Sequence, residues 1–271
     1  MTLFSQWRHG WLGPGLMVLA ACSSQNDSID TPDVRPVSVA PAGIYEGTWT
    51  AAGGAQTAVT AFLGKGENTE KMMVFDADGA RIASGVYTTV EAARSISWTA
   101  RVFEPVTTTD EDSGTQTTTT GVTTLTGQGA YAEEDSVQLS FTRSTGGTGT
   151  LALSYDADAY ETRSDVSLIQ GDWGVLDAYG TATTRLSVDA GGGFSGSNAD
   201  GCTYNGKFVV IAQQYNLYRV TLTTSCPGSS TSVITDGLAS LLPAAAGESS
   251  PTLVAVANSD KAATLLRLEP L

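Results

Sequence analysis

The sequence has one histidine, His9, and it lies close to the amino terminus. Catalytic Ser-His-Asp and Cys-His arrangements need an imidazole, and imidazole is also the commonest metal ligand. A Ser-x-x-Lys nucleophile motif is missing as well. These absences predict a protein that is not an enzyme and that has neither a cofactor nor a metal site.

Positive charge is also scarce: the chain has 14 Lys and Arg but 28 Asp and Glu, which gives a formal net charge of −14. Nucleic acids and anionic lipid headgroups bind basic surfaces. We therefore expect no nucleic-acid partner. Any attachment to a membrane has to come from something other than surface charge.

Long apolar runs are absent, and the run Trp11 to Ala21 is too short to cross a bilayer as a helix. It follows Arg8 and ends in small residues, the layout of a secretory signal peptide. Gly13, Pro14 and Gly15 interrupt this run. Two simple interpretations of this run are an ordinary signal peptide and a buried apolar segment, and in both of them Cys22 is incidental.

The stretch Leu19-Ala20-Ala21-Cys22 resembles the lipobox of bacterial lipoproteins. The resemblance implies cleavage after residue 21 and acylation of Cys22, for example with palmitate, which anchors the chain durably. Ser23 follows in place of the aspartate that retains lipoproteins in the inner membrane, which implies the outer membrane of the cell envelope, facing the periplasm or the cell surface. Residues 1–21 are then the signal peptide, and the proline-interrupted segment 22–42 is an extended tether.

Cysteine is rare, with Cys202 and Cys226 left over once Cys22 is acylated. Two thiols outside the cytoplasm usually pair, so we expect a disulfide between them. Closing a loop of about 25 residues stabilises a fold by roughly 3 kcal/mol on the chain-entropy model. Two separate buried thiols are the alternative.

Short segments of alternating or clustered apolar and threonine residues follow one another from residue 43 onward. Turn residues separate them, among them Gly53-Gly54, Asp78-Gly79, Gly127-Gln128-Gly129 and Gly146-Gly147. This pattern predicts an all-β fold of two tandem antiparallel β-barrel or β-sandwich modules, with about eight strands in each. Strands are expected at 44–50, 56–63, 71–76, 81–90, 95–103, 122–126, 136–142, 150–155, 184–188, 193–196, 202–211, 216–224, 232–242, 252–258 and 263–268.

The segment from Glu104 to Gly121 interrupts this pattern, since it has few large apolar residues. We expect it to be a mobile loop. Asp110-Glu111-Asp112 lies inside it and lacks the spaced ligands of a calcium loop, so we interpret it as a solvated charge cluster.

The two halves of the chain share an internal repeat. Four pairs of segments match in order: Gly47-x-Trp49 with Gly171-x-Trp173, Asp76–Gly79 with Asp189–Gly192, Val137–Phe141 with Tyr218–Leu222, and Thr150–Leu153 with Thr264–Leu268. We expect a first module at 43–155, a connector at 156–167 and a second module at 168–271. The alternative is that all β-proteins share such patterns.

The connector is acidic and has few apolar residues, so the two modules are expected to lack a shared core and to unfold separately. Ser164 is expected to cap a short turn through Leu168-Ile169.

The Gly-x-Trp motif also resembles the opening strand of lipocalins and the wider calycin barrels. In that family the tryptophan closes one end of the barrel and an arginine of the last strand packs on it. The resemblance implies that Arg267 serves Trp173. The first half has no arginine at 150–155, so the resemblance is partial there, and a generic core tryptophan is the alternative.

A stretch between Phe194 and Gly206 has two interpretations. As a binding loop pinned by Cys202, it offers Asn198, Asp200, Tyr204 and Asn205 for hydrogen bonds and Phe194 as a stacking face. As a hairpin, it uses Asp200-Gly201 for a tight turn. The hairpin is the preferred interpretation.

Three functional hypotheses remain open at this point. The first is a non-catalytic, lipid-anchored envelope protein that binds an envelope protein or a glycan, or has a scaffold role. The second is a calycin-like carrier of a small apolar ligand, which requires a hollow barrel. The third is a carboxylate-dependent hydrolase, although no pair of acids stands out.

Overall fold

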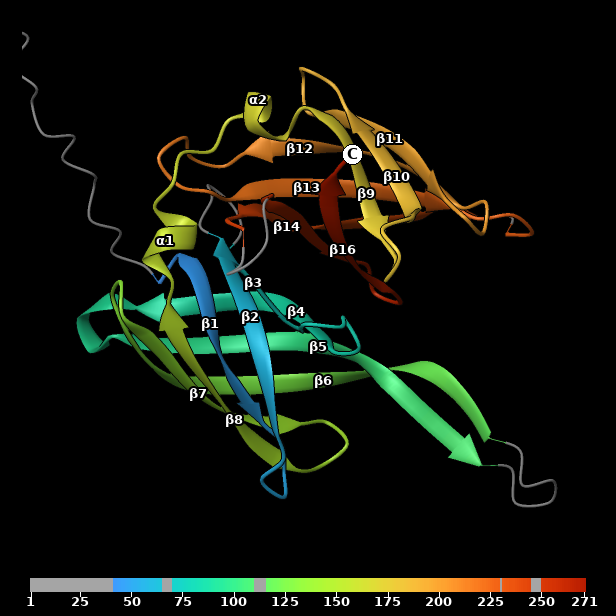
Figure 1. The fold of residues 1–271 in the computed structure, drawn as a ribbon. Helices are drawn as coiled ribbons and strands as arrows, with labels where there is room; N and C mark the ends of the chain where they lie inside the picture. Colours follow the sequence, from blue (N-terminus) through green and yellow to red (C-terminus); the bar gives the residue numbers. More distant parts are fainter. Residues whose placement is uncertain (1–40, 65–69, 110–115, 230, 245–249) are drawn as a thin grey trace, which may run out of the picture. The chain divides into compact units, whose positions relative to one another are not determined.

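The computed structural model describes residues 41–64, 70–109, 116–229, 231–244 and 250–271. In these ranges the chain is almost entirely β-strand, arranged as two closed antiparallel barrels of eight strands each (Figure 1). The predicted all-β class is confirmed, and the modules are barrels, not sandwiches. Both barrels belong to one compact unit.

The first barrel is a simple meander in which each strand pairs with the next, and the first strand pairs with the eighth to close it. A single 3₁₀ turn, Glu91–Ala93, joins the fourth and fifth strands. Its strands are β1 (Gly43–Thr50), β2 (Gln56–Gly64), β3 (Lys71–Asp76), β4 (Ile82–Val90), β5 (Ser95–Thr109), β6 (Gln116–Ala132), β7 (Ser136–Arg143) and β8 (Thr148–Tyr155).

The second barrel repeats the same meander, and it closes where its first strand pairs with its last. Its strands are β9 (Gly171–Leu176), β10 (Ala182–Val188), β11 (Gly193–Asn198), β12 (Thr203–Val210), β13 (Tyr218–Ser225), β14 (Val233–Leu242), β15 (Thr252–Asn258) and β16 (Ala263–Pro270).

Two single-turn helices, α1 (Ala157–Tyr160) and α2 (Val166–Ile169), occupy the connector (Figure 1). The side chain of Asp165, not that of Ser164, caps α2 by accepting a hydrogen bond from the backbone nitrogen of Ser167. The Ser164 hydroxyl instead donates to the carbonyl oxygen of Ala212 at 2.9 Å. The expected cap is therefore wrong by one residue, because the helix begins at Val166 and Asp165 occupies the N-cap position.

Only two of the four repeat matches lie on equivalent strands. The Gly-x-Trp motifs are on β1 and β9, and the last pair is on β8 and β16. The second pair falls after the third strand in one barrel and after the second strand in the other, while the third pair falls on the seventh and fifth strands. The barrels repeat in topology, but the two middle sequence matches are coincidental.

The predicted loop over 104–121 is wrong for the residues that are described there. β5 runs on to Thr109 and β6 begins at Gln116, and the two continue as a paired ribbon beyond the barrel wall (Figure 1). β-branched threonines favour extended backbone. Cross-strand pairing holds the two strands together although neither face of the ribbon is buried. The acidic cluster at 110–112 lies outside the described residues. We call the ribbon, 104–109 with 116–121, the arm.

Gly127-Gln128-Gly129 is not the predicted turn but the middle of β6. A Cβ atom at Gly129 would lie 1.8 Å from the carbonyl oxygen of Gln138 on the neighbouring strand. The glycine is therefore needed for close approach between strands, a role that sequence alone does not distinguish from a turn.

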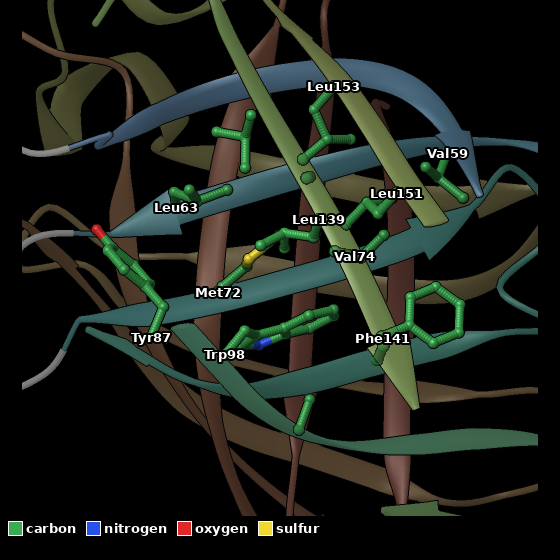
Figure 2. Packing of buried hydrophobic residues seen from close by; sticks show 14 of the residues in the cluster. Val59, Leu63, Met72, Val74, Tyr87, Trp98, Leu139, Phe141, Leu151 and Leu153 are labelled. Carbon is green, nitrogen blue, oxygen red and sulfur yellow. The ribbon is translucent and has the colours of Figure 1, made fainter. Parts of the chain in front are cut away.

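Side chains fill the interior of each barrel. In the first, residues such as Leu63, Met72, Trp98 and Leu151 are all at most 1% exposed and interdigitate across the barrel (Figure 2). In the second, Trp173, Phe208 and Tyr218 belong to a comparable cluster. The alternation of inward and outward residues along each strand produces this filling.

A third buried cluster joins the two barrels, so the expectation that they lack a shared core is wrong. The outer faces of both barrels contribute to it, and α1 adds two residues. Its buried members are Ala42, Ile44, Phe62, Met73, Phe75, Ile82, Phe103, Ala159, Tyr160, Leu217, Leu238, Val254 and Val256. We call this contact the junction. The division of the chain at 156–167 stays a prediction.

Candidate binding surface at the barrel junction

The aromatic residues of the expected binding loop point into the second barrel. Phe194 is 6% exposed and Tyr204 is 9% exposed. The Phe194 ring packs against Phe208, with 4.7 Å between the ring centroids. Phe194 therefore offers no stacking face to a ligand.

The polar residues of the same stretch form a hairpin between β11 and β12. The side-chain oxygen of Asn198 accepts a hydrogen bond from the backbone nitrogen of Cys202 at 2.9 Å, and its nitrogen lies 3.4 Å from an Asp200 oxygen. Gly201 has a positive φ of 81°, as the tight turn requires. Asn205 is exposed on β12. The geometry is that of the hairpin interpretation.

The disulfide between Cys202 and Cys226 is present, as predicted. The two cysteines directly flank the paired residues Thr203 and Ser225 on β12 and β13. The bond therefore fastens the open ends of two neighbouring strands. Cys22, the predicted acylation site, lies outside the described residues.

Arg267 does not serve Trp173. The Trp173 indole nitrogen donates to the carbonyl oxygen of Ile169 at 2.8 Å. Leu266 and Leu268 point into the second barrel, so Arg267 points outward. Its Nε donates to the carbonyl oxygen of Ala77 in the first barrel at 3.0 Å.

The arginine–tryptophan contact instead occurs in the first barrel, where the sequence did not predict it. The guanidinium groups of Arg81 and Arg143 lie 5.5 and 5.7 Å from the Trp49 ring centroid. Glu104 forms ion pairs with both arginines. Neither arginine is on the last strand of the barrel: Arg81 lies between β3 and β4, and Arg143 is the last residue of β7.

Glu104 holds this cluster together as a carboxylate. Burial alone would raise its pKa, but hydrogen bonds and charge from Arg143 and Arg81 outweigh burial and lower the pKa below the ordinary value. The three side chains are between 16 and 23% exposed. This arrangement is a closure of the barrel end and not an open ligand site.

Polar side chains border the apolar junction on one side. Lys71 Nζ donates to the backbone oxygen of Asp236 at 2.8 Å and to its carboxylate at 2.5 Å. The buried hydroxyl of Ser84 donates to the side-chain oxygen of Asn258 at 2.6 Å. Each contact joins one barrel to the other.

A cavity of about 430 Å³ opens beside these contacts. Ser84, Thr99, Arg101 and Thr124 of the first barrel line it, together with Asp236 and Asn258 of the second. Arg101 forms an ion pair with Asp260 at its border. The volume suits a small ligand. We call this the junction cavity.

A second hollow of about 440 Å³ lies on the outer face of β5, β6 and β7. Its polar lining consists of Ser97, Thr99, Thr126, Gln128, Ser140, Thr142 and Thr148. Thr99 lines both hollows. We call the second one the wall hollow.

The sequence held a signal for the junction that period-two alternation does not reveal. In β3 the run Met72–Phe75 is buried at every residue, and in β15 the run Leu253–Ala257 is too. A strand that is buried on both faces reads as a continuous apolar run, because neither face meets water.

No helix in the described part of the chain is long and apolar enough to span a membrane.

No family model matches the chain. No curated protein matches it either. Among solved structures, the chain is similar to the Aeromonas veronii immune modulator A, with 12% sequence identity and a TM-score of 0.37 over 86% of this chain and 95% of that one.

Proposed function

We propose that this protein is a non-catalytic, lipid-anchored component of the bacterial outer membrane that binds an envelope protein or glycan on the outer surface of its barrels. The lipobox ending at Cys22 supports the anchor. One observation supports the place of binding: side chains fill both barrel interiors, whereas the junction cavity and the wall hollow lie outside them.

The same observation argues against the carrier hypothesis. A carrier needs an apolar cavity of a few hundred Å³ within a barrel. Trp49, Trp98 and Tyr87 occupy the first interior, and each is at most 1% exposed. No observation on the described residues favours the hydrolase.

Photo-crosslinking in growing cells tests the proposal. A benzophenone amino acid replaces Val86, which is 55% exposed and lines the junction cavity. The matched control replaces Tyr179, an aromatic residue that is 94% exposed on the second barrel. We expect crosslinked envelope material at position 86 and little at position 179; equal yields at both positions, or none at position 86, contradict the proposal.

A fluorescence titration with N-phenylnaphthylamine tests the carrier hypothesis independently. A filled interior has no room for this apolar probe, so we expect no saturable signal. Saturable binding at one site per barrel would revive the carrier.

A further inference from the structure

We infer that the junction cavity and the wall hollow form one continuous track that binds an uncharged oligosaccharide. The inference rests on the outer-surface binding proposed above and names the class of ligand. Its basis is the continuity of the two hollows, the chemistry of their lining and their balance of charge.

Continuity follows from strand register. Thr99 lines both hollows and pairs directly with Thr126 of β6, which in turn pairs with Thr142 of β7. Ser97 and Gln128 form the next pair along the same two strands. Directly opposed residues have Cβ atoms about 4.5–5.5 Å apart. The outer wall therefore presents a regular grid of polar side chains that leads into the junction cavity.

The uncharged polar side chains of the lining carry hydroxyl or amide groups. Hydroxyls both donate and accept hydrogen bonds, and amides present both functions side by side. A sugar carries the same paired capacity on each of its hydroxyls. Val86 adds an apolar contact in the junction cavity that suits the C–H face of a sugar ring.

The cations at the track are already matched by anions. Lys71 pairs with Asp236, and Arg101 pairs with Asp260. The chain as a whole carries a net charge of −14, which repels acidic polymers. An uncharged glycan fits this balance, and a phosphorylated or carboxylated one does not.

The length of the track indicates more than one sugar. Two hollows of about 430 and 440 Å³ lie in succession along β5. A single sugar would occupy one of them and leave the shared Thr99 hydroxyl at its edge. A chain of several sugars engages both hollows and the residues between them.

The test is a calorimetric titration of the full-length protein, in a detergent without a sugar headgroup, with chitohexaose and maltohexaose. The variant T99V/T126V removes two opposed hydroxyls from the track, and valine preserves shape and strand preference. The matched control T107V/T118V removes an opposed pair from the same two strands in the arm, where the two hydroxyls are 2.9 Å apart.

We expect binding of at least one of the two hexasaccharides, an affinity that changes little with salt, and a loss of at least about fivefold in T99V/T126V alone. Equal affinity in both double variants overturns the inference. So does an affinity that weakens strongly as the salt concentration rises. If neither oligosaccharide binds while crosslinks still form at position 86, the inference fails and the proposed function stands.

Discussion

Lys71 of the first barrel donates two hydrogen bonds to Asp236 of the second, one to its backbone oxygen and one to its carboxylate. The Lys71 side chain is 15% exposed and the Asp236 side chain is 68% exposed. An ion pair with one solvated partner contributes little, so apolar packing supplies most of the stability of the junction.

This division of roles predicts a large difference between two junction variants. Phe75→Ala should lower the free energy of unfolding by about 3–5 kcal/mol, because Phe75 is fully buried against Phe62. Asp236→Asn should change it by less than about 1 kcal/mol. Urea unfolding of both variants gives the comparison, and equal effects would contradict the assignment.

The buried junction also predicts that the barrels depend on each other. Residues 43–160 and 164–271, expressed separately, should each be less stable than in the intact protein, because each exposes its share of the apolar junction. Calorimetry of the fragments and the intact chain decides this. Fragments that melt at the temperatures of the intact protein would show that the junction contributes nothing.

Loss of the disulfide should weaken the second barrel. Replacing Cys202 and Cys226 by alanine opens a cross-link between residues 24 positions apart, which costs roughly 3 kcal/mol on the chain-entropy model. Thermal unfolding measures the loss. Alkylation of the native wild type, with and without reductant, is the control, and ready labelling without reductant would rule the bond out.

The Glu104 cluster should make stability depend on pH. The pKa of Glu104 in the folded protein is lowered, so its stabilising contribution is present above the ordinary value of 4.5 and is lost as the pH falls through that range to the lowered pKa. Glu104→Gln should cost about 1–3 kcal/mol at neutral pH and flatten the acid limb of the stability curve.

Glu46→Gln is the matched control for this measurement, because Glu46 is an exposed glutamate of the same barrel. Urea midpoints measured across the acidic range compare the two variants. If the stability of Glu104→Gln falls at acidic pH as steeply as that of the wild type, Arg81 and Arg143 do not lower the pKa of Glu104.

The lipid anchor is tested at Cys22. Palmitate labelling of cells should mark the wild type and leave Cys22→Ala unlabelled, because acylation requires the thiol. Fractionation of the wild type should place it with the outer membrane, since Ser23 follows the cysteine. Equal label in both proteins would remove the lipoprotein assignment, and recovery with the inner membrane would remove the location.

The barrel fold could be predicted because local signals were consistent. Period-two alternation, as in Val137–Phe141 of β7, marks strands with one buried face. Glycine pairs such as Gly53-Gly54 adopt the positive φ angles of turns. With Cys22 assigned to acylation, Cys202 and Cys226 could pair only with each other, and the structure contains that disulfide.

The candidate site could not be predicted because it depends on contacts between distant strands. Ser84 meets Asn258 across 174 positions of sequence, and no periodicity encodes that pairing. The calycin resemblance pairs Arg267 with Trp173 because Arg267 lies on the last strand, yet its side chain points outward and its Nε donates to the carbonyl oxygen of Ala77. The direction in which a residue faces decides its partner, and register sets that direction.

The arm has a consequence for how this protein behaves at high concentration. A closed barrel exposes no strand edge, but β5 beyond Phe103 pairs only with β6, so both sides of the arm present unpaired backbone groups within the described residues. Pro105 has no N–H group and interrupts one of these sides. Unwanted sheet growth between neighbouring molecules would therefore begin at the arm and not at either barrel.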